Sequence, residues 1–376
     1  MITEIHFERD ESFYMKIGFI GLGLIGGSIA KTIRRVHPDA TILAYNRTQE
    51  VLNQAQREGI VDEAAWDITN AFGDCDYIFL CVPVVTMKKY LKELKPFLGF
   101  NTILTDVGST KGDIHAAVTE MGLSDCFIGG HPMAGSEKTG YANATDRMIE
   151  NAWYILTPGG NVPIEKVSAF TEFIRSLGAM PLILTSDEHD YITAAISHVP
   201  HVVSASLVNM VHSLDGREEY MRTIAAGGFK DITRISSSSP QMWQEICLAN
   251  SDNICEVLES FIRKLTDFRF AIRNGNKEKL MQYFSEAKSY RDSFAEEVSG
   301  PIDMLYRIYL DIKDEAGAVA RIATELAGEK ISIRNIGIVH NRVFEQGVLR
   351  IDFYDGETMK KGAELLKSRS YTVYEG

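Results

Sequence analysis

The sequence is poor in cysteine and in positive charge, and it lacks a long apolar run. Its five cysteines (Cys75, Cys81, Cys126, Cys247 and Cys255) form no Cys-x-x-Cys pair and no zinc pattern, which predicts a reduced, cytoplasmic protein without a metal site. No stretch of about 18 apolar residues occurs, so we expect no membrane span. Residues 1–14 lack the apolar core of a signal peptide and are interpreted as an N-terminal extension.

The charge balance excludes another class of partner. Lys and Arg number 39 against 51 Asp and Glu, which gives a formal net charge of −12. Such a chain is repelled by the nucleic-acid backbone and by anionic membrane surfaces. We therefore expect neither partner, and an anionic substrate would need local Arg or Lys side chains.

What the first half of the chain does contain is an alternation of apolar strands with amphipathic helices. A chain of 376 residues should form two or three domains. From Lys16 to about Leu184 the alternation predicts an α/β Rossmann-type fold, a mainly parallel sheet with helices on both faces. The expected strands are Ile17–Ile20, Thr41–Tyr45, Tyr77–Val82, Thr102–Asp106, Cys126–Ile128, Trp153–Leu156 and Pro181–Leu184.

After residue 186 the pattern becomes entirely helical. The apolar face of this block exceeds what a lone domain must bury, so we expect a homodimer formed through it. Ser239-Pro240 is a typical helix start, with Ser as N-cap and Pro at the first position. The expected helices are Asp187–Val211, Glu218–Ala225, Gln241–Asn274 and Lys277–Phe294.

Beyond a linker at Ser299-Gly300-Pro301, the last segment predicts a small βαββαβ, ferredoxin-like domain. Its expected elements are Leu305–Ile312, Ala318–Leu326, Ser332–Val339, Gly347–Tyr354, Glu357–Ser368 and Tyr371–Tyr374. The predicted domains are therefore a dinucleotide-binding domain at 15–185, a helical domain at 186–298 and a small domain at 303–376.

A glycine-rich turn, Gly21-Leu22-Gly23-Leu24-Ile25-Gly26, directly follows the first strand and opens a helix. This context predicts dinucleotide binding. Gly21 would allow the tight turn, Gly23 would admit the pyrophosphate, and Gly26 would let helix and strand pack closely. Leu24 and Ile25 begin the helix, whose N-terminus attracts anions.

The residues that would contact the cofactor ribose follow the second strand. NAD enzymes usually carry an acid there, whereas this chain has Asn46-Arg47. Asn46 does not repel a 2′-phosphate, and Arg47 could pair with one or stack on adenine. We expect NAD and do not exclude NADP. Val82-Pro83 ends a neighbouring strand over the same crevice.

The segment Gly129–Gly140 (GGHPMAGSEKTG) carries a histidine in an unusual setting. Its two leading glycines permit positive φ and close approach, and Pro132 restricts His131 to extended geometry. We expect His131 on a stiff turn at the end of the Cys126–Ile128 strand. It is either an acid or base near neutral pH or the surface histidine of an ordinary turn.

Two more segments place polar residues near the predicted crevice. Ser109 follows a strand in TDVGSTK and should face the carboxyl edge of the sheet, or cap the helix that begins near Lys111. Arg234, in GGFKDITRI ahead of Trp243, suits a substrate carboxylate, unless it pairs with Asp231 at the surface.

His198 and His201 lie three residues apart in SHVPH, on one face of a helix that Pro200 should kink. No HExxH pattern or obvious third ligand accompanies them, so core packing or hydrogen bonding to substrate fits better than metal binding.

Seven segments together resemble the prephenate dehydrogenase family over residues 16 to about 295. They are GLGLIGGS, TDVGSTK, GGHPMAGSEKTG, NAWYILTP, ISHVPH, GGFKDITRI and SSSPQMW. The resemblance implies oxidation of prephenate with NAD(P)⁺, release of CO2 and formation of 4-hydroxyphenylpyruvate in tyrosine biosynthesis. It also implies that His131 accepts the proton, or a hydrogen bond, from the ring hydroxyl. Ser109 would support this hydroxyl and His131, and Arg234 would hold a carboxylate. Glu137, His198, His201 and Trp243 would line the substrate pocket.

The last segment resembles an ACT domain, the amino-acid-sensing module often fused to this family. The resemblance implies tyrosine as an effector, with Gly317, Asn335 and Ile336 in the ligand-contacting region. The turn Asp314-Glu315-Ala316-Gly317 lacks the proline expected before its glycine.

Three other functions remain open from the sequence. Arogenate dehydrogenase shares the ring chemistry and differs in the substrate side chain. A catalytically silent amino-acid sensor predicts a damaged site, whereas His131, Ser109 and Arg234 are all present. A β-hydroxyacid dehydrogenase would need a lysine in the helical block, and no lysine there has suitable neighbours.

Overall fold

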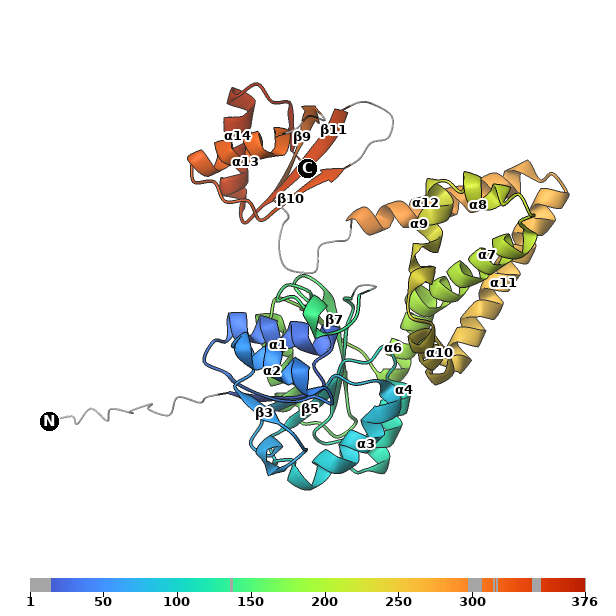
Figure 1. Cartoon of the computed structure of the whole chain (residues 1–376). Coiled ribbons are helices and arrows are strands. Elements are labelled where there is room, and N and C mark those ends of the chain that lie inside the picture. Colours follow the sequence, from blue (N-terminus) through green and yellow to red (C-terminus); the bar gives the residue numbers. More distant parts are fainter. Residues whose placement is uncertain are drawn as a thin grey trace. The chain divides into compact units, whose positions relative to one another are not determined.

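The computed structural model describes residues 15–135, 138–296, 306–313, 315, 317–339 and 346–375. Among the predicted features, the extension 1–14, Glu137, the linker and Ala316 lie outside these residues. The chain divides into two compact units, Met1–Thr266 and Asp267–Gly376 (Figure 1). Each unit is described by itself.

The first unit begins with a five-stranded parallel sheet of order β3-β2-β1-β4-β5. The prediction missed β3, a short strand without an apolar run. The strands are β1 Lys16–Ile20, β2 Thr41–Tyr45, β3 Glu63–Ala65, β4 Tyr77–Leu80 and β5 Ile103–Asp106, and the helices between and after them are α1 Leu24–Val36, α2 Gln49–Arg57, α3 Val84–Leu94 and α4 Gly112–Glu120.

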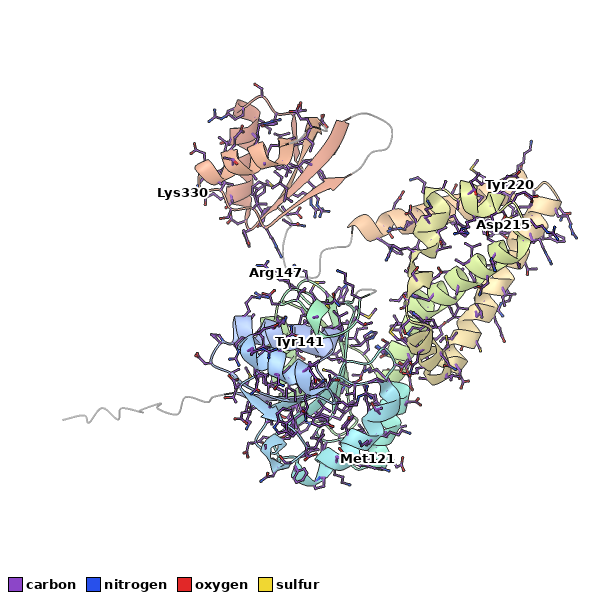
Figure 2. The ribbon with its side chains drawn as sticks, viewed as in Figure 1. Met121, Tyr141, Arg147, Asp215, Tyr220 and Lys330 are labelled. Atoms are coloured by element: carbon purple, nitrogen blue, oxygen red, sulfur yellow. The ribbon has the colours of Figure 1, made fainter. Side chains whose placement is uncertain are left out.

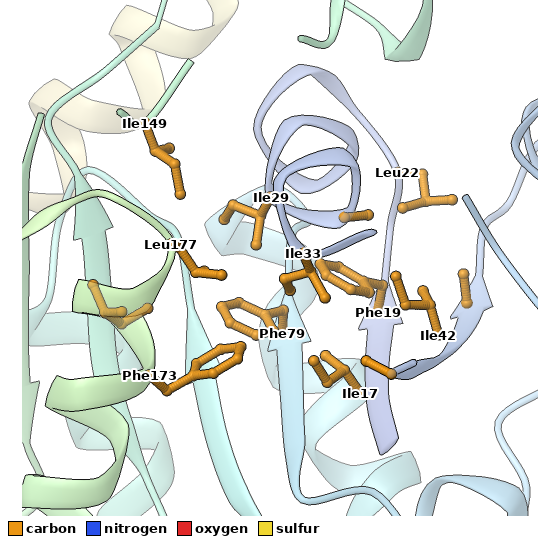
Figure 3. Packing of buried hydrophobic residues seen from close by; sticks show 14 of the residues in the cluster. Ile17, Phe19, Leu22, Ile29, Ile33, Ile42, Phe79, Ile149, Phe173 and Leu177 are labelled. Carbon is orange, nitrogen blue, oxygen red and sulfur yellow. The ribbon is translucent and has the colours of Figure 1, made fainter. Parts of the chain in front are cut away.

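Helices cover both faces of this sheet, as predicted. Successive residues of β4 enter different hydrophobic clusters, because side chains alternate across a strand. Phe79 packs with α1, α2 and α5 (Ile164–Ser176), whereas Ile78 and Leu80 pack with α3 and α4. Figure 3 shows the first cluster, in which Phe79 and Phe173 lie beside Ile29 and Ile33 of α1.

A three-stranded sheet follows, made of β6 (Ile128–Pro132), β7 (Trp153–Pro158) and β8 (Met180–Ile183). Strands β6 and β7 are antiparallel, and β7 and β8 are parallel. A parallel bridge between Leu104 and Phe127 joins the segment before β6 to β5. The expected strand Cys126–Ile128 therefore begins and ends later, and this shift moves His131 from a turn into a strand.

Helices fill the rest of the first unit and extend into the second. The prediction of one helix over Gln241–Asn274 was wrong, because α10 ends at Ala249 and α11 begins at Ser251. The Ser239 hydroxyl accepts from the Met242 amide, as its N-cap position predicts. The helices are α6 Ser186–Thr193, α7 Val199–Leu214, α8 Tyr220–Ile224, α9 Gly227–Thr233, α10 Pro240–Ala249, α11 Ser251–Arg273 and α12 Lys277–Glu296.

The stretch Ser186–Leu214 is continuous helix, with a π-helical segment at Ala194–His198 directly before Pro200. A proline cannot donate its backbone hydrogen bond, so an irregularity is expected next to it. By length and composition alone this stretch could cross a membrane, and 22% of its apolar 18-residue section is buried. The sequence analysis did not anticipate this, because His198, His201 and Asn209 interrupt its apolar residues.

The second unit contains a four-stranded antiparallel sheet of order β10-β11-β9-β12. The element order βαββαβ confirms the predicted ferredoxin-like fold. Gly317 precedes α13 with φ of +88°, a conformation that favours glycine. The elements are β9 Tyr306–Lys313, α13 Ala318–Gly328, β10 Asn335–Val339, β11 Gln346–Phe353, α14 Gly356–Ser368 and β12 Val373–Glu375.

Candidate active site

The glycine-rich turn joins β1 to α1, and each of its three glycines has different surroundings that explain why a side chain is absent there. Gly21 has φ of +97°, and a Cβ there would lie 2.6 Å from the Cys81 carbonyl oxygen. A Cβ on Gly26 would lie 2.6 Å from the Gly21 carbonyl oxygen and 2.7 Å from Cys81 Cβ. A Cβ on Gly23 would meet nothing within 4 Å. Open space at the second glycine is what the approach of a pyrophosphate requires.

The N-terminus of α1 is suited to an anion. Its N-cap, Gly23, makes no side-chain capping bond, and the first turn contains no acid. The first amides of a helix have no intrahelical partner, and their aligned dipoles favour negative charge. Leu24 and Ile25, both half-buried, begin this turn. These residues therefore fit the pyrophosphate of a dinucleotide cofactor.

Asn46 follows β2 and supports the same turn. Its Oδ1 accepts from the Leu22 amide at 2.9 Å, and its Nδ2 donates to the Thr48 carbonyl at 3.0 Å. Arg47 is exposed, Val82 is half-buried, and Pro83 precedes α3. The ribose end of the predicted cofactor site thus contains a neutral amide beside an exposed cation.

Asn46→Asp should weaken NADP⁺ binding about 10-fold or more and leave NAD⁺ binding within about 3-fold, because like charges disfavour each other in close contact. The carboxylate can still accept from the Leu22 amide, so the turn should persist. Dissociation constants for both cofactors, measured by titration calorimetry, test this. Arg47→Ala is the matched control: it removes a cation without adding an anion, and should weaken only NADP⁺. Equal weakening of both cofactors by Asn46→Asp would show that Asn46 does not select the phosphate.

His131 lies in β6, opposite Ile155 of β7, rather than on a turn. The expectation of a turn was wrong because the glycines before it serve close approach rather than positive φ. A Cβ on Gly130 would lie 2.6 Å from the Asp106 carbonyl oxygen and 3.0 Å from the Tyr154 ring. Only glycine therefore lets β6 pass this close to β5. The His131 side chain is nearly buried, with 9% of the residue exposed.

A buried ion pair holds β6 just before His131. Lys111 Nζ lies 2.5 Å from Asp106 Oδ2 and donates to the Gly130 carbonyl at 2.8 Å. Asp106 Oδ1 accepts from the Gly130 amide at 3.1 Å, and Oδ2 accepts from the Gly108 amide at 2.8 Å. Both side chains are fully buried. The sequence analysis missed this pair, although both residues lie in the TDVGSTK segment.

Behind His131 lies a second pair that sequence reasoning missed. His131 Nδ1 lies 2.8 Å from His189 Nε2, and His189 Nδ1 lies 2.8 Å from Asp190 Oδ1. His189 is fully buried. Asp190 also accepts from the Lys111 amide at 2.7 Å and from the Gly112 amide at 2.8 Å. The signal was a His-Asp dipeptide at the start of a helix that directly follows a strand.

The same contacts test the interpretation of Ser109 as a helix cap. Helix α4 begins at Gly112 with Lys111 as N-cap, and its first amides are satisfied by Asp190. Ser109 is therefore not the cap. It is half-buried in the connection between β5 and α4, and it forms no hydrogen bond within the described part of the chain.

The helical side contributes a connected group. His198 is 1% exposed, and its Nδ1 lies 3.2 Å from Asn250 Nδ2, which also donates to the Asp190 carbonyl at 2.7 Å. His201 stacks on Trp243 with ring centroids 3.7 Å apart. Arg234 is exposed. Burial lowers the pKa of His201, the positive charge of Arg234 lowers it further, and a hydrogen bond to Ser197 partly opposes both. No group of three metal-binding side chains occurs in the described ranges.

Charge and burial favour the neutral form of His131 and of His198. Burial, followed by the positive potentials of His189, Lys111 and His198, holds the pKa of His131 well below 6.5. Burial also lowers the pKa of His198 to about 4. We expected His131 to have a pKa near neutral pH, whereas desolvation lowers this pKa and keeps the imidazole uncharged over a wider pH range. It can therefore accept a proton at any pH near 7.

The segment after His131 is anchored on the cofactor side. Tyr141, labelled in Figure 2, packs against α1, where a Cβ on Gly27 would lie 2.7 Å from its ring. Its hydroxyl donates to Glu58 at 2.9 Å, and Lys31 lies 4.6 Å from its ring centroid. The glycine-rich helix and the histidine segment are thus in contact.

The chain is similar to known proteins along most of its length. Family models match it as "Prephenate dehydrogenase, nucleotide-binding domain" over residues 29–183 and as "Prephenate dehydrogenase, dimerization domain" over 185–286. A prephenate dehydrogenase of Bacillus subtilis (strain 168) is 37% identical over 352 residues, which cover 93% of this chain and 95% of that relative.

Two solved structures share the fold of the first three quarters. Prephenate dehydrogenase from A. aeolicus, in complex with hydroxyphenyl propionate and NAD⁺, has a TM-score of 0.70 at 31% identity, covering 74% of this chain and 98% of its own. Synechocystis arogenate dehydrogenase has a TM-score of 0.68 at 30% identity, covering 74% of this chain and 100% of its own.

Proposed function

The chain belongs to the prephenate dehydrogenase family, and from this premise we propose how its own residues perform the reaction. It is an NAD-dependent oxidoreductase that converts prephenate to 4-hydroxyphenylpyruvate by oxidative decarboxylation, in tyrosine biosynthesis. The single observation that carries the residue assignment is His131, a buried neutral imidazole held on a glycine strand that packs against the end of β5.

We assign to His131 the removal of the proton from the ring hydroxyl of prephenate. When bound, NAD⁺ accepts the hydride from the carbon that bears this hydroxyl. A base positioned at the hydroxyl assists such a step, and loss of CO2 follows because it makes the ring aromatic. The chain's contribution is to orient the substrate, exclude water and hold the proton.

Other residues take supporting roles in the proposal. Ser109, in the connection that follows β5, would hydrogen-bond the substrate hydroxyl. Arg234 would hold a substrate carboxylate, and His198, His201 and Trp243 would shape the pocket around it. Trp243 Nε1 is buried without a partner among the described residues, which supports a role in binding a polar ligand group. Glu137 stays a sequence-based expectation.

Arg234→Gln should weaken prephenate binding roughly 10- to 100-fold, because a hydrogen bond to a charged group contributes about 1.5–3 kcal/mol. KM should rise while kcat changes less, since the carboxylate is bound equally before and during the reaction. Arg217→Gln, at an exposed arginine of the same helical region, is the control and should leave KM unchanged. Loss of stability without a change in KM would make Arg234 structural.

Arogenate is the second candidate substrate, because an arogenate dehydrogenase shares this fold at 30% identity. Initial rates on prephenate and on arogenate, each with NAD⁺ and NADP⁺, test the function directly. Turnover of prephenate with NAD⁺ is expected. Turnover of arogenate without prephenate would overturn the substrate assignment, and no turnover of either would favour a silent amino-acid sensor.

We propose that residues 303–376 form an ACT domain that inhibits the enzyme when tyrosine binds. The two family models match residues 29–183 and 185–286, so this segment follows both matched domains. In the small domain, Asn335 begins β10 and donates to the buried Asp352 at 3.4 Å, and Ile336 packs partly against the core. Gly317 directly precedes α13 in the left-handed conformation.

Deleting residues 303–376 should preserve turnover of prephenate and abolish inhibition by tyrosine. Inhibition curves for the full chain and the truncated chain, at a fixed prephenate concentration, provide the measurement. If tyrosine inhibits both equally, it acts at the active site through its resemblance to the product, and the proposal for this domain fails.

We also propose that the chain forms three domains, at 15–185, 186–298 and 303–376. The helical domain would join two copies of the chain in a homodimer. Large apolar side chains of α11 and α12 are exposed in the single chain, including Phe270 (69%), Met281 (69%) and Phe284 (66%). A second copy would cover them, which agrees with the match of residues 185–286 to a dimerization domain. Sedimentation as a 42.0 kDa monomer would contradict this.

The cytoplasm is the proposed location. All five cysteines are free, as a reducing compartment allows. The apolar stretch Ser186–Leu214 includes residues of the proposed site, among them His189 and His198, and a substrate with two carboxylates reaches them from water. Cell fractionation tests this, with recovery in the membrane pellet as the opposing result.

A further inference from the structure

His131, His189 and Asp190 form a linear chain of hydrogen-bonding groups inside the protein. The two links, His131 Nδ1 to His189 Nε2 and His189 Nδ1 to Asp190 Oδ1, are each 2.8 Å. All three side chains are buried, with 9%, 0% and 5% of the residues exposed. The inference drawn from this chain rests on the proposed role of His131 as the base.

The positions of the hydrogens on His189 and His131 follow from the ionisation state of Asp190. Burial alone would raise the pKa of Asp190, but hydrogen bonds from His189, Gly112 and Lys111 outweigh burial and leave that pKa below its ordinary value. Asp190 is therefore ionised and can only accept. A neutral His189 then carries its one hydrogen on Nδ1 and keeps a lone pair on Nε2. That lone pair requires a hydrogen on His131 Nδ1.

We propose that His189 and Asp190 are positioning residues that lock His131 in the tautomer with its lone pair on Nε2. A neutral imidazole has one donor nitrogen and one acceptor nitrogen, so fixing the hydrogen on Nδ1 makes Nε2 the proton acceptor. The reacting hydroxyl loses its proton to Nε2: the O–H bond breaks and an N–H bond forms. The His189–Asp190 pair then stabilises the resulting imidazolium through Nδ1–H.

Other charged groups near His131 do not supply this function. From β5, Asp106 is paired with Lys111 and bonded to the Gly130 and Gly108 amides. Lys111 and His198 supply no negative charge, and both lower the pKa of His131, as His189 does. From α4, the His115 imidazole bonds to Thr157 at 2.8 Å. Of the groups named, only the His189–Asp190 pair both accepts from Nδ1 and ends in a negative charge.

Two amide substitutions of His189 distinguish a role in orienting His131 from a role in merely filling space. In His189→Gln the side-chain oxygen can reach the place of Nε2 and accept from His131. In His189→Asn the shorter amide reaches only the place of Nδ1, so Asp190 keeps a donor while His131 loses its acceptor. Both variants are polar and differ by one methylene, which makes each the control for the other. Circular dichroism and NAD⁺ affinity establish that both fold.

His189→Asn should lower kcat for prephenate about 100-fold or more with little change in KM, since a wrong tautomer in a related His–Asp arrangement costs about 10⁴-fold. His189→Gln should recover kcat to within about 10-fold of the wild type. Equal effects of the two variants on kcat would overturn the proposal.

A second measurement does not depend on the substrate. Nitrogen NMR of the full protein with ¹⁵N-labelled histidine, assigned with His131→Asn, should show a protonated Nδ1 and an unprotonated Nε2 at pH 7 for His131. The opposite tautomer would overturn the proposal even if prephenate is turned over. If prephenate is not turned over but this tautomer is found, the proposed function fails and the tautomer lock stands.

Discussion

Replacing His131 by Asn should lower kcat for prephenate about 10²- to 10⁴-fold, the range expected when a general base is lost. Asn fits the strand and can donate a hydrogen bond, but it cannot accept a proton. NAD⁺ should bind within about 3-fold of its wild-type affinity, because the cofactor turn is built from β1, α1 and β2. Steady-state kinetics and cofactor titration measure the two effects separately.

The pH profile supplies the control for this substitution. The pKa of His131 is held well below 6.5 by burial and by nearby positive groups, so the neutral, proton-accepting form persists as pH falls through 6.5. Wild-type kcat/KM should therefore stay level from pH 8 to about 6.5 and decline only well below that, as His131 becomes protonated. In His131→Asn this acid limb should disappear. An unchanged rate, or an acid limb that persists in the variant, would remove His131 from the proposed role.

Periodicity in the sequence was sufficient for most of the fold. Alternating apolar strands and helices predicted the parallel sheet with two covered faces, and the order of elements predicted the small βαββαβ domain. Strand β3 was missed because Glu63, Ala64 and Ala65 carry no apolar run. The long predicted helix contains a break at Asn250, where the side chain turns inward to bond Asp190 and His198.

The site was harder to predict because its main contacts join distant segments. Gly129 and Gly130 have the composition of a turn, yet they lie in a strand, since Asp106 and Tyr154 leave no space for a side chain at Gly130. Local propensity cannot report a neighbour that arrives from another strand. Similarly, His189 and Asp190 look like the polar first turn of a helix, and only the fold places them behind His131.

A second large effect is expected at Lys111. Lys111→Met should destabilise the first unit by about 3–5 kcal/mol, because it leaves the Asp106 carboxylate buried without its cation. The Gly130 carbonyl also loses a donor, so the strand that carries His131 loses one of its two bonds to this pair. Typical domains are stable by only about 5–15 kcal/mol, so the loss should appear as a clear fall in the urea midpoint.

Lys88→Met tests whether this loss comes from the buried pair rather than from removing a lysine. Lys88 is exposed on α3, and surface substitutions usually change stability by less than about 0.5 kcal/mol. The urea midpoint of Lys88→Met should match the wild type, and the two variants have the same composition. If both midpoints agree, the Asp106–Lys111 pair contributes no net stability. A fall confined to Lys111→Met, with kcat reduced in the fraction that stays folded, would show that one buried cation both stabilises the sheet and positions the base.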